Sequence, residues 1–522
     1  MTTVPTPVTP VDAAPGEVTD HLLGPRVPVG DHLLERLRSV CAHVTVEDAD
    51  RTEAGRDWWP LAIRWAMRGA VPARPGAVAR PTDADQVAAV LAACHDARVP
   101  VTAIAGRSGV CGASVPVFGG VALDLCGLAG VVDVDTTSLL ADVRPGTFGP
   151  DLEVALRATG TTLGHWPQSM DLSTVGGWVA CRGAGQYSTR YGKIEDMVAG
   201  LEVALADGRL IRTSGTGPRA AVGPDLTQVF VGSEGVLGVI TEAQLRLHPV
   251  AAAEGRRAFG FPGFADGLDA CRRILRRGGT PAVLRLYDHV ESARNFESGD
   301  HCVLVVLDEA DPGLLDATLR IVEAECASGG ATALDEALVQ RWVGHRNDVS
   351  ALAPLYRAGI VVDTIEIAAR WSSLPGIYAA CVAALQDLDG TLAASAHQSH
   401  AYVDGACLYF TFAGRMPEAA GTDGPPGDDP PDDDPSGIDA ADAWAERYYA
   451  AAWRVVMDTV RAHGGAISHH HGIGLNRGRF VAEALGGAFD VLVDLKNALD
   501  PRGILNPGKL GLPSPFGEVH WP

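Results

Sequence analysis

The chain of 522 residues is short of the features that mark secreted, membrane and nucleic-acid-binding proteins. Its ten cysteines are scattered with no Cys-x-x-Cys pair, which disfavours a disulfide framework or a zinc site and favours reduced thiols in a cytoplasmic protein. No apolar run reaches the ~18 residues of a membrane span. Basic residues are few, 42 against 64 acidic ones, and the net charge of −22 repels nucleic acid. We therefore expect a globular protein with no integral membrane segment and no nucleic-acid partner.

Two segments lack the apolar residues that a packed core needs. MTTVPTPVTPVDAAPGEV, at the start, has neither a basic patch nor an apolar run, so we expect a frayed tail and not a signal peptide. GTDGPPGDDPPDDDPSG, residues 421–437, is acidic and rich in proline, and we expect a disordered surface loop. The chain as a whole exceeds the size that one hydrophobic core supports, so two or more domains are expected.

The hydrophobic pattern between these segments predicts alternating helices and strands. Thr82 and Asp85 resemble a capping box at the start of an amphipathic helix. Asp207-Gly208 marks the turn of a hairpin over residues 201–213. Further helices are predicted at 31–72, 151–157, 261–277, 313–327 and 372–387, from 440, and from 495, and strands at 99–105, 119–125, 139–143, 283–287, 303–307 and 408–412.

Three glycine-rich segments follow one another along the chain. They read AIAGRSGVCGAS (103–114), GHWPQSMDLSTVGGWVACRGAG (164–185) and GSEGVLGVIT (232–241). Glycine lets a backbone approach a large anionic ligand, and successive N–H groups can form a concave anion nest. Each segment alone is weak evidence, and the first is not the G-x-G-x-x-G of a Rossmann site. Together they predict the cradle of a flavin dinucleotide.

A family resemblance rests on these segments and on five others. The others are YGKIEDMV (191–198), GPRAAVGPD (217–225), PAVLRLYD (281–288), GACLYFTF (405–412) and SHHHGIG (468–474). In this order they resemble the alkylglycerone-phosphate synthase (alkyldihydroxyacetonephosphate synthase) family of FAD-linked oxidases, within the vanillyl-alcohol-oxidase or PCMH-type superfamily. The ending LDPRGILNPGK also resembles FAD oxidases of the D-lactate and glycolate dehydrogenase type.

The resemblance implies an α+β protein built around a PCMH-type FAD-binding domain of two α/β lobes, residues 74–250. An N-terminal tail and helical segment, 1–73, would precede it. An α+β substrate (cap) domain, 251–450, would follow, and a C-terminal helical segment, 451–522, would complete the active site and the FAD domain.

The resemblance also implies the flavin contacts, carried over position by position. They are Ala103, Ile104, Ala105, Gly106, Arg107, Ser108 and Gly109; Gln168, Ser169, Met170, Asp171, Leu172, Ser173 and Thr174; Cys181, Arg182, Gly183 and Ala184; and Glu234, Gly235, Val236, Leu237, Gly238, Val239 and Ile240. Some relatives attach FAD through a His in a loop resembling RSGGH. Here the loop has no His, so we expect noncovalent FAD, with a thioether to Cys111 as the alternative.

The candidate catalytic residues are Tyr409, Arg285 and the triplet His469, His470 and His471. Imidazoles suit proton transfer near neutral pH, and the resemblance implies that the triplet lines the flavin site. Adjacent His residues on an extended chain point to opposite faces, so we predict no metal site there. The resemblance places the family's catalytic Tyr at Tyr409 and an Arg important for activity at Arg285.

The implied activity exchanges the acyl group of acyl-dihydroxyacetone phosphate for a fatty alcohol in ether-lipid synthesis, with no net redox change. The family's substrate-phosphate Arg falls near Leu352 here, and Arg346 and Arg357 are the nearest cations. A buried phosphate without a cation is costly, so the departure favours the alternative, an FAD-linked oxidase or dehydrogenase of a 2-hydroxy acid or alcohol. A flavin-binding scaffold without turnover is a third hypothesis. We expect a small-molecule or lipid-like substrate, and leave open a homodimer and peripheral contact with a membrane.

Overall fold

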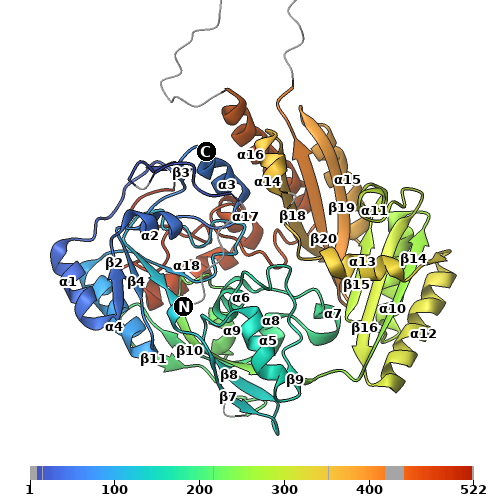
Figure 1. The fold of residues 1–522 in the computed structure, drawn as a ribbon, viewed down its shortest axis with the longest axis horizontal. Coiled ribbons are helices and arrows are strands. Elements are labelled where there is room, and N and C mark those ends of the chain that lie inside the picture. Colours follow the sequence, from blue (N-terminus) through green and yellow to red (C-terminus); the bar gives the residue numbers. More distant parts are fainter. Residues whose placement is uncertain (1–8, 15, 215–216, 351, 418–439, 520–522) are drawn as a thin grey trace, which may run out of the picture.

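The computed structural model describes residues 9–14, 16–214, 217–350, 352–417 and 440–519. Figure 1 shows two small lobes on one side of the molecule and a larger sheet with its helices on the other. The predicted disordered loop at 421–437 lies outside the described residues. Among the described helices, none is both long enough and apolar enough to cross a membrane.

The first lobe is a four-stranded sheet in the order β2-β4-β6-β5. Its strands are β2 (His43–Thr45), β4 (Ala77–Arg80), β5 (Val101–Ile104) and β6 (Val121–Asp124), with α1 (Asp31–Val40), α2 (Asp48–Glu53), α4 (Ala84–Ala97) and the turn η1 (Leu125–Gly127) around them. The region predicted as one helical stretch, 31–72, also holds β2, α3 (Pro60–Ala66) and β3 (Ala70–Val71), which pairs with β1 (Thr19–Asp20). The cap of α4 is Asp83, which accepts from Gln86 N at 2.8 Å, so the capping box predicted at Thr82 and Asp85 is wrong.

The second lobe is a five-stranded sheet in the order β11-β10-β12-β8-β7. Its strands are β7 (Val131–Asp135), β8 (Leu140–Val143), β10 (Val198–Ala204), β11 (Leu210–Arg212) and β12 (Val239–Arg246), and β9 (Thr161–Thr162) pairs with β13 (His248–Pro249) beside it. Its helices are α5 (Gly149–Arg157), α6 (Val175–Cys181), α7 (Ser188–Tyr191), α8 (Ile194–Met197) and α9 (Leu226–Phe230). The predicted hairpin is confirmed, because β10 and β11 pair antiparallel on either side of Asp207-Gly208.

The cap is a seven-stranded antiparallel sheet in the order β17-β14-β16-β15-β19-β20-β18. Its strands are β14 (Ala253–Phe261), β15 (Val283–Tyr287), β16 (Cys302–Ala310), β17 (Thr332–Leu334), β18 (Val361–Arg370), β19 (Thr391–Ala401) and β20 (Gly405–Gly414). Its helices are α10 (Phe264–Arg276), α11 (His289–Phe296), α12 (Pro312–Ser328), α13 (Ala337–His345), α14 (Leu352–Arg357) and α15 (Leu374–Gln386). The helix predicted from residue 261 begins three residues later, because Phe261 ends β14.

Strand β15 shows how the cap sheet presents two different faces. Leu284 and Leu286 belong to the core that α10 covers with Phe264 and Leu268. Figure 1 shows α10 and α12 on the side of this sheet away from the two lobes. Arg285, between them, and Tyr287, after Leu286, have the opposite orientation, because side chains alternate along a strand. Arg285 and Tyr287 therefore face the lobes and become available to a site.

The last part of the chain returns to both halves of the molecule. Helix α16 (Ala440–Ala462) packs on β18 and α15, so the boundary predicted at residue 450 falls within it. After α17 (Gly478–Leu485) and α18 (Ala488–Leu499), Leu505 bridges to Val101 of the first lobe. This architecture confirms the predicted α+β class, with two small lobes, a cap and a C-terminal segment.

Candidate active site

A cavity of about 1040 Å³ is lined by residues of both lobes, the cap and the C-terminal segment. Pockets for one drug-sized ligand hold roughly 300–1,000 Å³, so this cavity has room for more than one such ligand. One wall comes from the three glycine-rich segments, and we call it the cradle wall. A second wall comes from β15, β18, β19, β20, α11, α13 and α14, and we call it the cap wall.

Most of the residues predicted to bind FAD line the cradle wall. They are residues 103–109, Gln168, Ser169, Leu172, Ser173, Thr174, Cys181, Gly183, Ala184, Glu234, Gly235, Gly238, Val239 and Ile240. Five of the predicted contacts are not among the lining residues: Met170, Asp171, Arg182, Val236 and Leu237. Met170, Val236 and Leu237 belong instead to the hydrophobic core of the second lobe.

Three glycines of the cradle wall lie where an added Cβ would make only ordinary contacts with the protein, whereas others in the same segments, such as Gly106, are closely packed. A Cβ atom added at Gly109, Gly177 or Gly235 would meet no protein atom closer than 3.6, 3.5 and 3.7 Å, respectively. Three non-glycine residues in these segments, Arg107, Arg182 and Glu234, have positive φ angles of 52°, 61° and 49°, and Arg107 and Glu234 line the cavity. Such backbone is costly for an L-residue and clusters where a chain must fit a ligand. The wall is therefore shaped by backbone for close approach.

Several buried polar atoms on the cradle wall have no partner within the described structure. They include both ring nitrogens of His165, the Thr174 hydroxyl and the Gln186 carbonyl oxygen, and all three residues line the cavity. Buried polar groups are nearly always hydrogen-bonded, so these atoms are available to bond a ligand with polar edges. A flavin offers such edges together with a flat face, and the residues present fit FAD.

The His triplet lies on a bent loop held by two buried carboxylates. Glu366 of β18 accepts from His471 N at 2.8 Å and from the Arg477 guanidinium at 2.8 Å, and it also accepts from His469 N. Glu234 of the cradle wall accepts from the Ile473 and Gly474 amides at 2.5 and 2.8 Å. Arg477 is fully buried and compensates the charge of Glu366. The loop bends where we predicted an extended chain, so its side chains need not alternate.

Tyr409 and His471 meet at the junction of the cap wall and this loop. The Tyr409 hydroxyl lies 3.3 Å from His471 Nε2 and accepts from the Thr364 hydroxyl at 3.1 Å. Burial lowers the pKa of His471 to about 4, and burial raises the pKa of Tyr409. At neutral pH the imidazole is therefore uncharged and the phenol keeps its proton. His470 also lines the cavity, whereas His469 is not among the lining residues.

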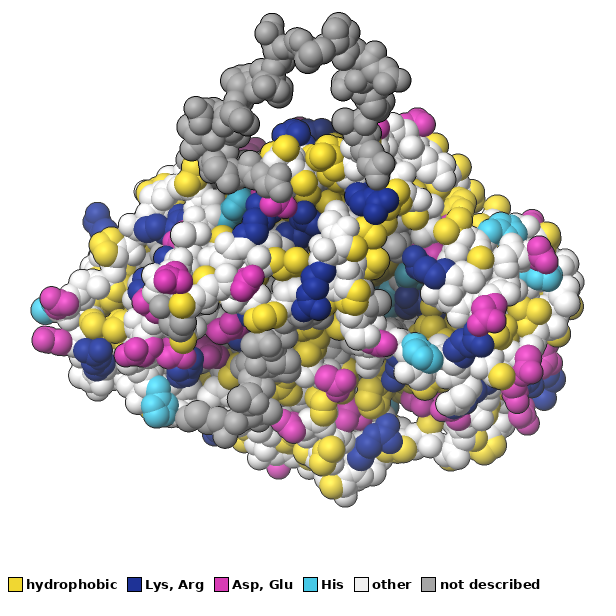
Figure 2. Space-filling model, turned by 45° about the horizontal axis from the view of Figure 1, so that its top comes forward, with side chains coloured by type: hydrophobic (Ala, Val, Ile, Leu, Met, Phe, Trp, Pro, Cys, Tyr) yellow, Lys and Arg dark blue, Asp and Glu magenta, His cyan; other side chains and the backbone are white. Residues whose placement is uncertain are grey.

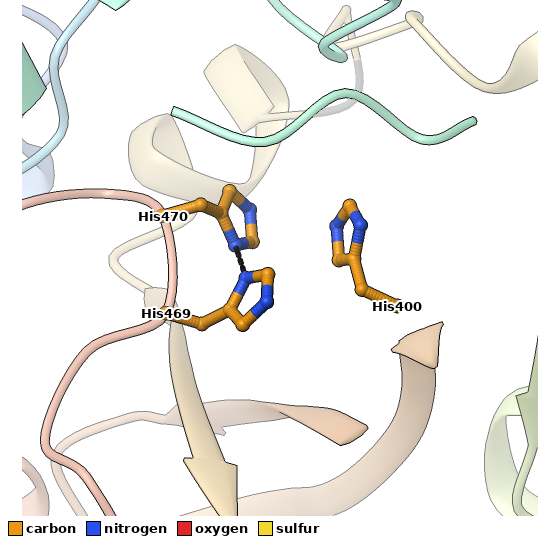
Figure 3. A group of neighbouring side chains, drawn as sticks. All are labelled: His400, His469 and His470. Carbon is orange, nitrogen blue, oxygen red and sulfur yellow. Dashed lines mark hydrogen bonds between the residues drawn. The ribbon is translucent and has the colours of Figure 1, made fainter. Parts of the chain in front are cut away.

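A second imidazole group is formed with His400, which no motif in the sequence marks. His400, His469 and His470 each offer a nitrogen, and these atoms lie within 4.8 Å of one another. Figure 3 shows His400 reaching from the end of a strand towards the two loop residues, whose Nδ1 atoms are 2.9 Å apart. Three such donors could hold a late first-row divalent metal. The prediction of no metal considered the triplet alone, without this third strand-borne imidazole.

The cap wall carries Arg285, a predicted catalytic residue, and His397, which was not predicted. Arg285 Nη2 and His397 Nε2 are 2.5 Å apart, and His397 Nδ1 lies 2.7 Å from Glu291 Oε2. Glu291 also accepts from the Thr411 hydroxyl at 2.9 Å. All of these residues line the cavity. In a regular strand His397 and His400 would face opposite ways, but a register shift between Gln398 and His400 lets both line the cavity.

Arg346 is the other arginine of the cap wall without a carboxylate partner in the described structure. It donates to the Tyr187 hydroxyl at 3.0 Å and lies over the Trp342 ring at 5.6 Å. Leu352, where the family's phosphate Arg would fall, also lines the cavity, beside Leu355, Tyr356 and Val362. Arg357 is not among the lining residues. The cavity thus combines a cationic recess with an apolar end.

Figure 2 shows Asp and Glu side chains spread over the face that it presents, among Lys and Arg, and not gathered in one patch. With a net charge of −22, the protein as a whole does not attract anions. Affinity for an anionic ligand must therefore come from the local placement of the arginines inside the cavity.

Comparisons with known proteins match this architecture. Residues 75–214 match the family model "FAD binding domain", and residues 254–510 match "FAD linked oxidases, C-terminal domain". The uncharacterized FAD-linked oxidoreductase YgcU of Escherichia coli K12 is 30% identical over 84% of this chain and 89% of its own length. Alkyldihydroxyacetonephosphate synthase of Dictyostelium discoideum is 28% identical over 85% of this chain and 74% of its own length.

Solved structures share the fold. A structure of alkyldihydroxyacetonephosphate synthase superposes with a TM-score of 0.75 at 23% identity, over 96% of this chain and 88% of the other. p-Cresol methylhydroxylase with substrate bound gives 0.71 at 18% identity, over 94% and 98%. These findings confirm the resemblance drawn from the glycine-rich segments. By its two matched domains and its relatives, the chain belongs to the FAD-linked oxidase family and takes FAD as its cofactor.

Proposed function

We propose that this protein is an FAD-dependent enzyme of the alkylglycerone-phosphate synthase type, which exchanges the acyl group of acyl-dihydroxyacetone phosphate for a fatty alcohol. The observation that carries the proposal is the composition of one cavity. It joins the cradle wall to a proton-transfer pair, to two arginines without carboxylate partners in the described structure, and to an apolar end. A substrate with an anionic head and an aliphatic chain matches that combination.

The anionic head is assigned to Arg285 and Arg346. Both guanidinium groups lie over the Trp342 ring, at 6.0 and 5.6 Å, so they point into the same part of the cavity. Arg346 thereby takes over the charge that is missing at Leu352. Charge-assisted hydrogen bonds from two arginines would offset the desolvation of a phosphate or carboxylate.

The proton is assigned to Tyr409 and His471. FAD, when bound, supplies the flavin ring beside which the substrate carbon reacts. The uncharged His471 accepts a proton from the substrate carbon through the Tyr409 hydroxyl, and the pair returns it when the fatty alcohol has replaced the acyl group. Strand β20, which carries Tyr409, pairs with β18 and β19 on its two sides, so the backbone of this residue is held within the cap sheet.

The test is the reaction itself. Holoenzyme incubated with acyl-dihydroxyacetone phosphate and hexadecanol should release a fatty acid and form the alkyl ether in equal amounts. If the FAD-loaded protein forms no ether while its visible spectrum stays that of oxidised flavin, this proposal is wrong.

A second candidate is an FAD-linked oxidase or dehydrogenase of a 2-hydroxy acid or alcohol. Leu352 favours it, because the arginine expected there for a phosphate is absent. Burial also lowers the pKa of His470 to about 3, which leaves an uncharged base to take a hydroxyl proton. Anaerobic bleaching of the flavin by a panel of 2-hydroxy acids, with no fatty alcohol present, would favour this candidate over the first.

A further inference from the structure

Arg285 is held differently from Arg190 and Arg477, two other arginines that the fold buries largely or fully. Arg190 makes two hydrogen bonds to the buried Asp308 carboxylate, at 2.7 and 2.6 Å, and Arg477 binds Glu366 directly at 2.8 Å. In both pairs a carboxylate cancels the charge of the guanidinium. Arg285 instead contacts the imidazole of His397, and the nearest carboxylate of this network, Glu291, lies on the far side of that ring.

The chemistry of the donors fixes the protons in this network. A guanidinium only donates hydrogen bonds, so His397 Nε2 must accept from Arg285. His397 Nδ1 then carries the ring proton and donates it to Glu291, 2.7 Å away. Glu291 is 1% exposed and His397 5% exposed, so neither exchanges its partner for water. His397 is therefore a neutral spacer between a buried anion and the arginine.

Other groups hold the spacer and its carboxylate in place. The His397 ring stacks on Tyr409, with centroids 4.9 Å apart and an interplanar angle of 21°. Glu291 accepts from the Thr411 hydroxyl at 2.9 Å and the Ser395 hydroxyl at 3.2 Å. Two further charged groups lie near Glu291: Arg294 of the same helix, α11, is 3.4 Å from Oε1, and Asp288 caps the N-terminus of that helix and accepts from Glu291 N at 2.9 Å. The spacer is thus fixed from β19, β20 and α11 together.

We propose that the Glu291–His397 pair is a positioning device, which fixes the Arg285 guanidinium in the cavity without neutralising it and so reserves its charge for an oxyanion of the substrate. This inference rests on the role given to Arg285 in the proposed function. It concerns two residues outside the expected cofactor segments, of which His397 also stacks on Tyr409 of the proton-transfer pair. The oxyanion is a phosphate or a carboxylate, and its source is decided by which probe binds.

The test compares two substitutions of His397 in the FAD-loaded protein. His397→Gln keeps an acceptor for Arg285 and a donor for Glu291 in one planar amide. His397→Phe keeps the ring that stacks on Tyr409 but loses both nitrogens. His289→Gln, on the exposed side of α11, is the matched control because His289 bonds only to backbone carbonyls outside the cavity.

Binding of inorganic phosphate and of oxalate is read from the change in the visible flavin spectrum, without turnover. We expect His397→Phe to bind whichever anion the wild type prefers at least about tenfold more weakly, and His397→Gln to stay within about threefold. With substrate, KM should rise in His397→Phe by a larger factor than kcat falls. FAD content and thermal unfolding of each variant show whether the fold is kept.

Two outcomes separate this inference from the proposed function. If His397→Phe binds the anion as tightly as wild type while Arg285→Met does not, the positioning role is wrong and the role of Arg285 stands. If Arg285→Met also binds the anion as tightly as wild type, the anion assignment itself is wrong. Equal weakening in His397→Gln and His397→Phe would also overturn the inference, because the amide preserves the spacer's hydrogen bonds.

Discussion

The two walls of the cavity are built from different parts of the polypeptide. The cradle wall is made by backbone: glycines at 109, 177 and 235 leave room for a Cβ atom, and Arg107 and Glu234 adopt left-handed conformations. The cap wall is made by side chains, which strands and helices of the cap bring together from distant positions. The cradle wall is suited to a large, tightly bound cofactor, and the cap wall to the anionic group of a substrate that binds and dissociates.

The difference predicts separable consequences of mutation. A change on the cradle wall alters the space that the backbone leaves free, so it should appear first as loss of FAD. A change on the cap wall alters a charge or a proton donor, so it should leave FAD in place and appear in kcat or KM. Substitutions on the two walls can therefore separate loss of FAD from loss of turnover.

The largest effect is expected at Gly177. A leucine there would project into the cavity from α6, because the nearest protein atom to an added Cβ is Thr174 Oγ1 at 3.5 Å. We expect purified Gly177→Leu to carry less than about a tenth of the wild-type FAD, since overfilling a packed site costs ~1–3 kcal/mol or more. FAD content is measured by absorbance after denaturation.

Gly313→Leu is the matched control, because Gly313 lies at the exposed start of α12 and its added Cβ would meet only Asp311 Oδ1, at 3.4 Å. It should retain full FAD. Full FAD content in Gly177→Leu would show that the backbone of α6 does not face the cofactor.

The next largest effect is expected at Tyr409, where the cap wall meets the His loop. Tyr409→Phe removes the hydroxyl 3.3 Å from His471 Nε2 and leaves the ring stacked on His397. We expect kcat to fall by ~10²–10⁴, the usual range for a positioned proton donor, with FAD content unchanged. Steady-state kinetics and the visible spectrum check both parts.

Tyr448→Phe serves as the comparison for that variant. Its hydroxyl bonds Thr391 at 2.8 Å, and Tyr448 is not among the residues lining the cavity. Turnover in this control should remain near wild type. A normal kcat in Tyr409→Phe would exclude its hydroxyl from the proton path and leave His471 or His470 to act alone.

A smaller effect is expected at Arg346. Arg346→Met removes a charge that has no carboxylate partner in the described structure and keeps most of the apolar stem on Trp342. Hydrogen bonds to charged groups contribute ~1.5–3 kcal/mol, so KM for an anionic substrate should rise roughly 10- to 150-fold. Arg272→Met, which breaks only an ion pair with Asp269 on α10, should leave KM unchanged. An unaltered KM in Arg346→Met would mean that Arg285 alone binds the anionic group of the substrate.

The same contrast explains what can be predicted from the sequence. The cradle wall is formed by contiguous segments, so its glycines and hydroxyls at 103–109 and 168–174 are recognisable from the order of residues alone. The position of Arg285 follows from its contiguous motif in the same way. Glu291 and His397 are not recognisable, and Arg346 is only a nearby cation in the sequence. None of the three belongs to a recognisable motif, and each reaches the site only because the fold brings it beside residues of other elements.

Local irregularity accounts for the other differences. His397 and His400 are three residues apart, a spacing that places side chains on opposite faces of a regular strand. The register shift after Gln398 reverses that expectation, and nothing in the sequence marks it. The sequence predicts an extended chain at the His triplet, but Glu366 and Glu234 bend its loop by accepting four of its backbone N–H groups.

The smallest effect on turnover is expected from His165 on the cradle wall. Its effect should appear instead in the pH dependence of the free energy of unfolding. Burial lowers the pKa of His165 to about 3, so the folded protein leaves this ring unprotonated where the unfolded chain, with a pKa near 6.5, binds a proton. Because the unfolded state binds more protons between these values, stability falls as pH falls from 6.5. Between pH 6.5 and 5.0 this one residue should lower the free energy of unfolding by about 1.5 kcal/mol.

His165→Phe keeps the aromatic contact with Trp178, whose centroid lies 4.7 Å away, but cannot titrate. We expect the free energy of unfolding to fall by about 1.5 kcal/mol less in the variant than in wild type between pH 6.5 and 5.0. It is measured by urea titration at saturating FAD. His397 differs because its pKa, lowered by burial to about 4, is coupled to Arg285 and Glu291, so His397→Gln would change stability and anion binding together. If the free energy of unfolding of His165→Phe depends on pH as it does in wild type, the His165 ring is not held uncharged in the folded protein. The cradle wall would then carry a charged side chain, as the cap wall does.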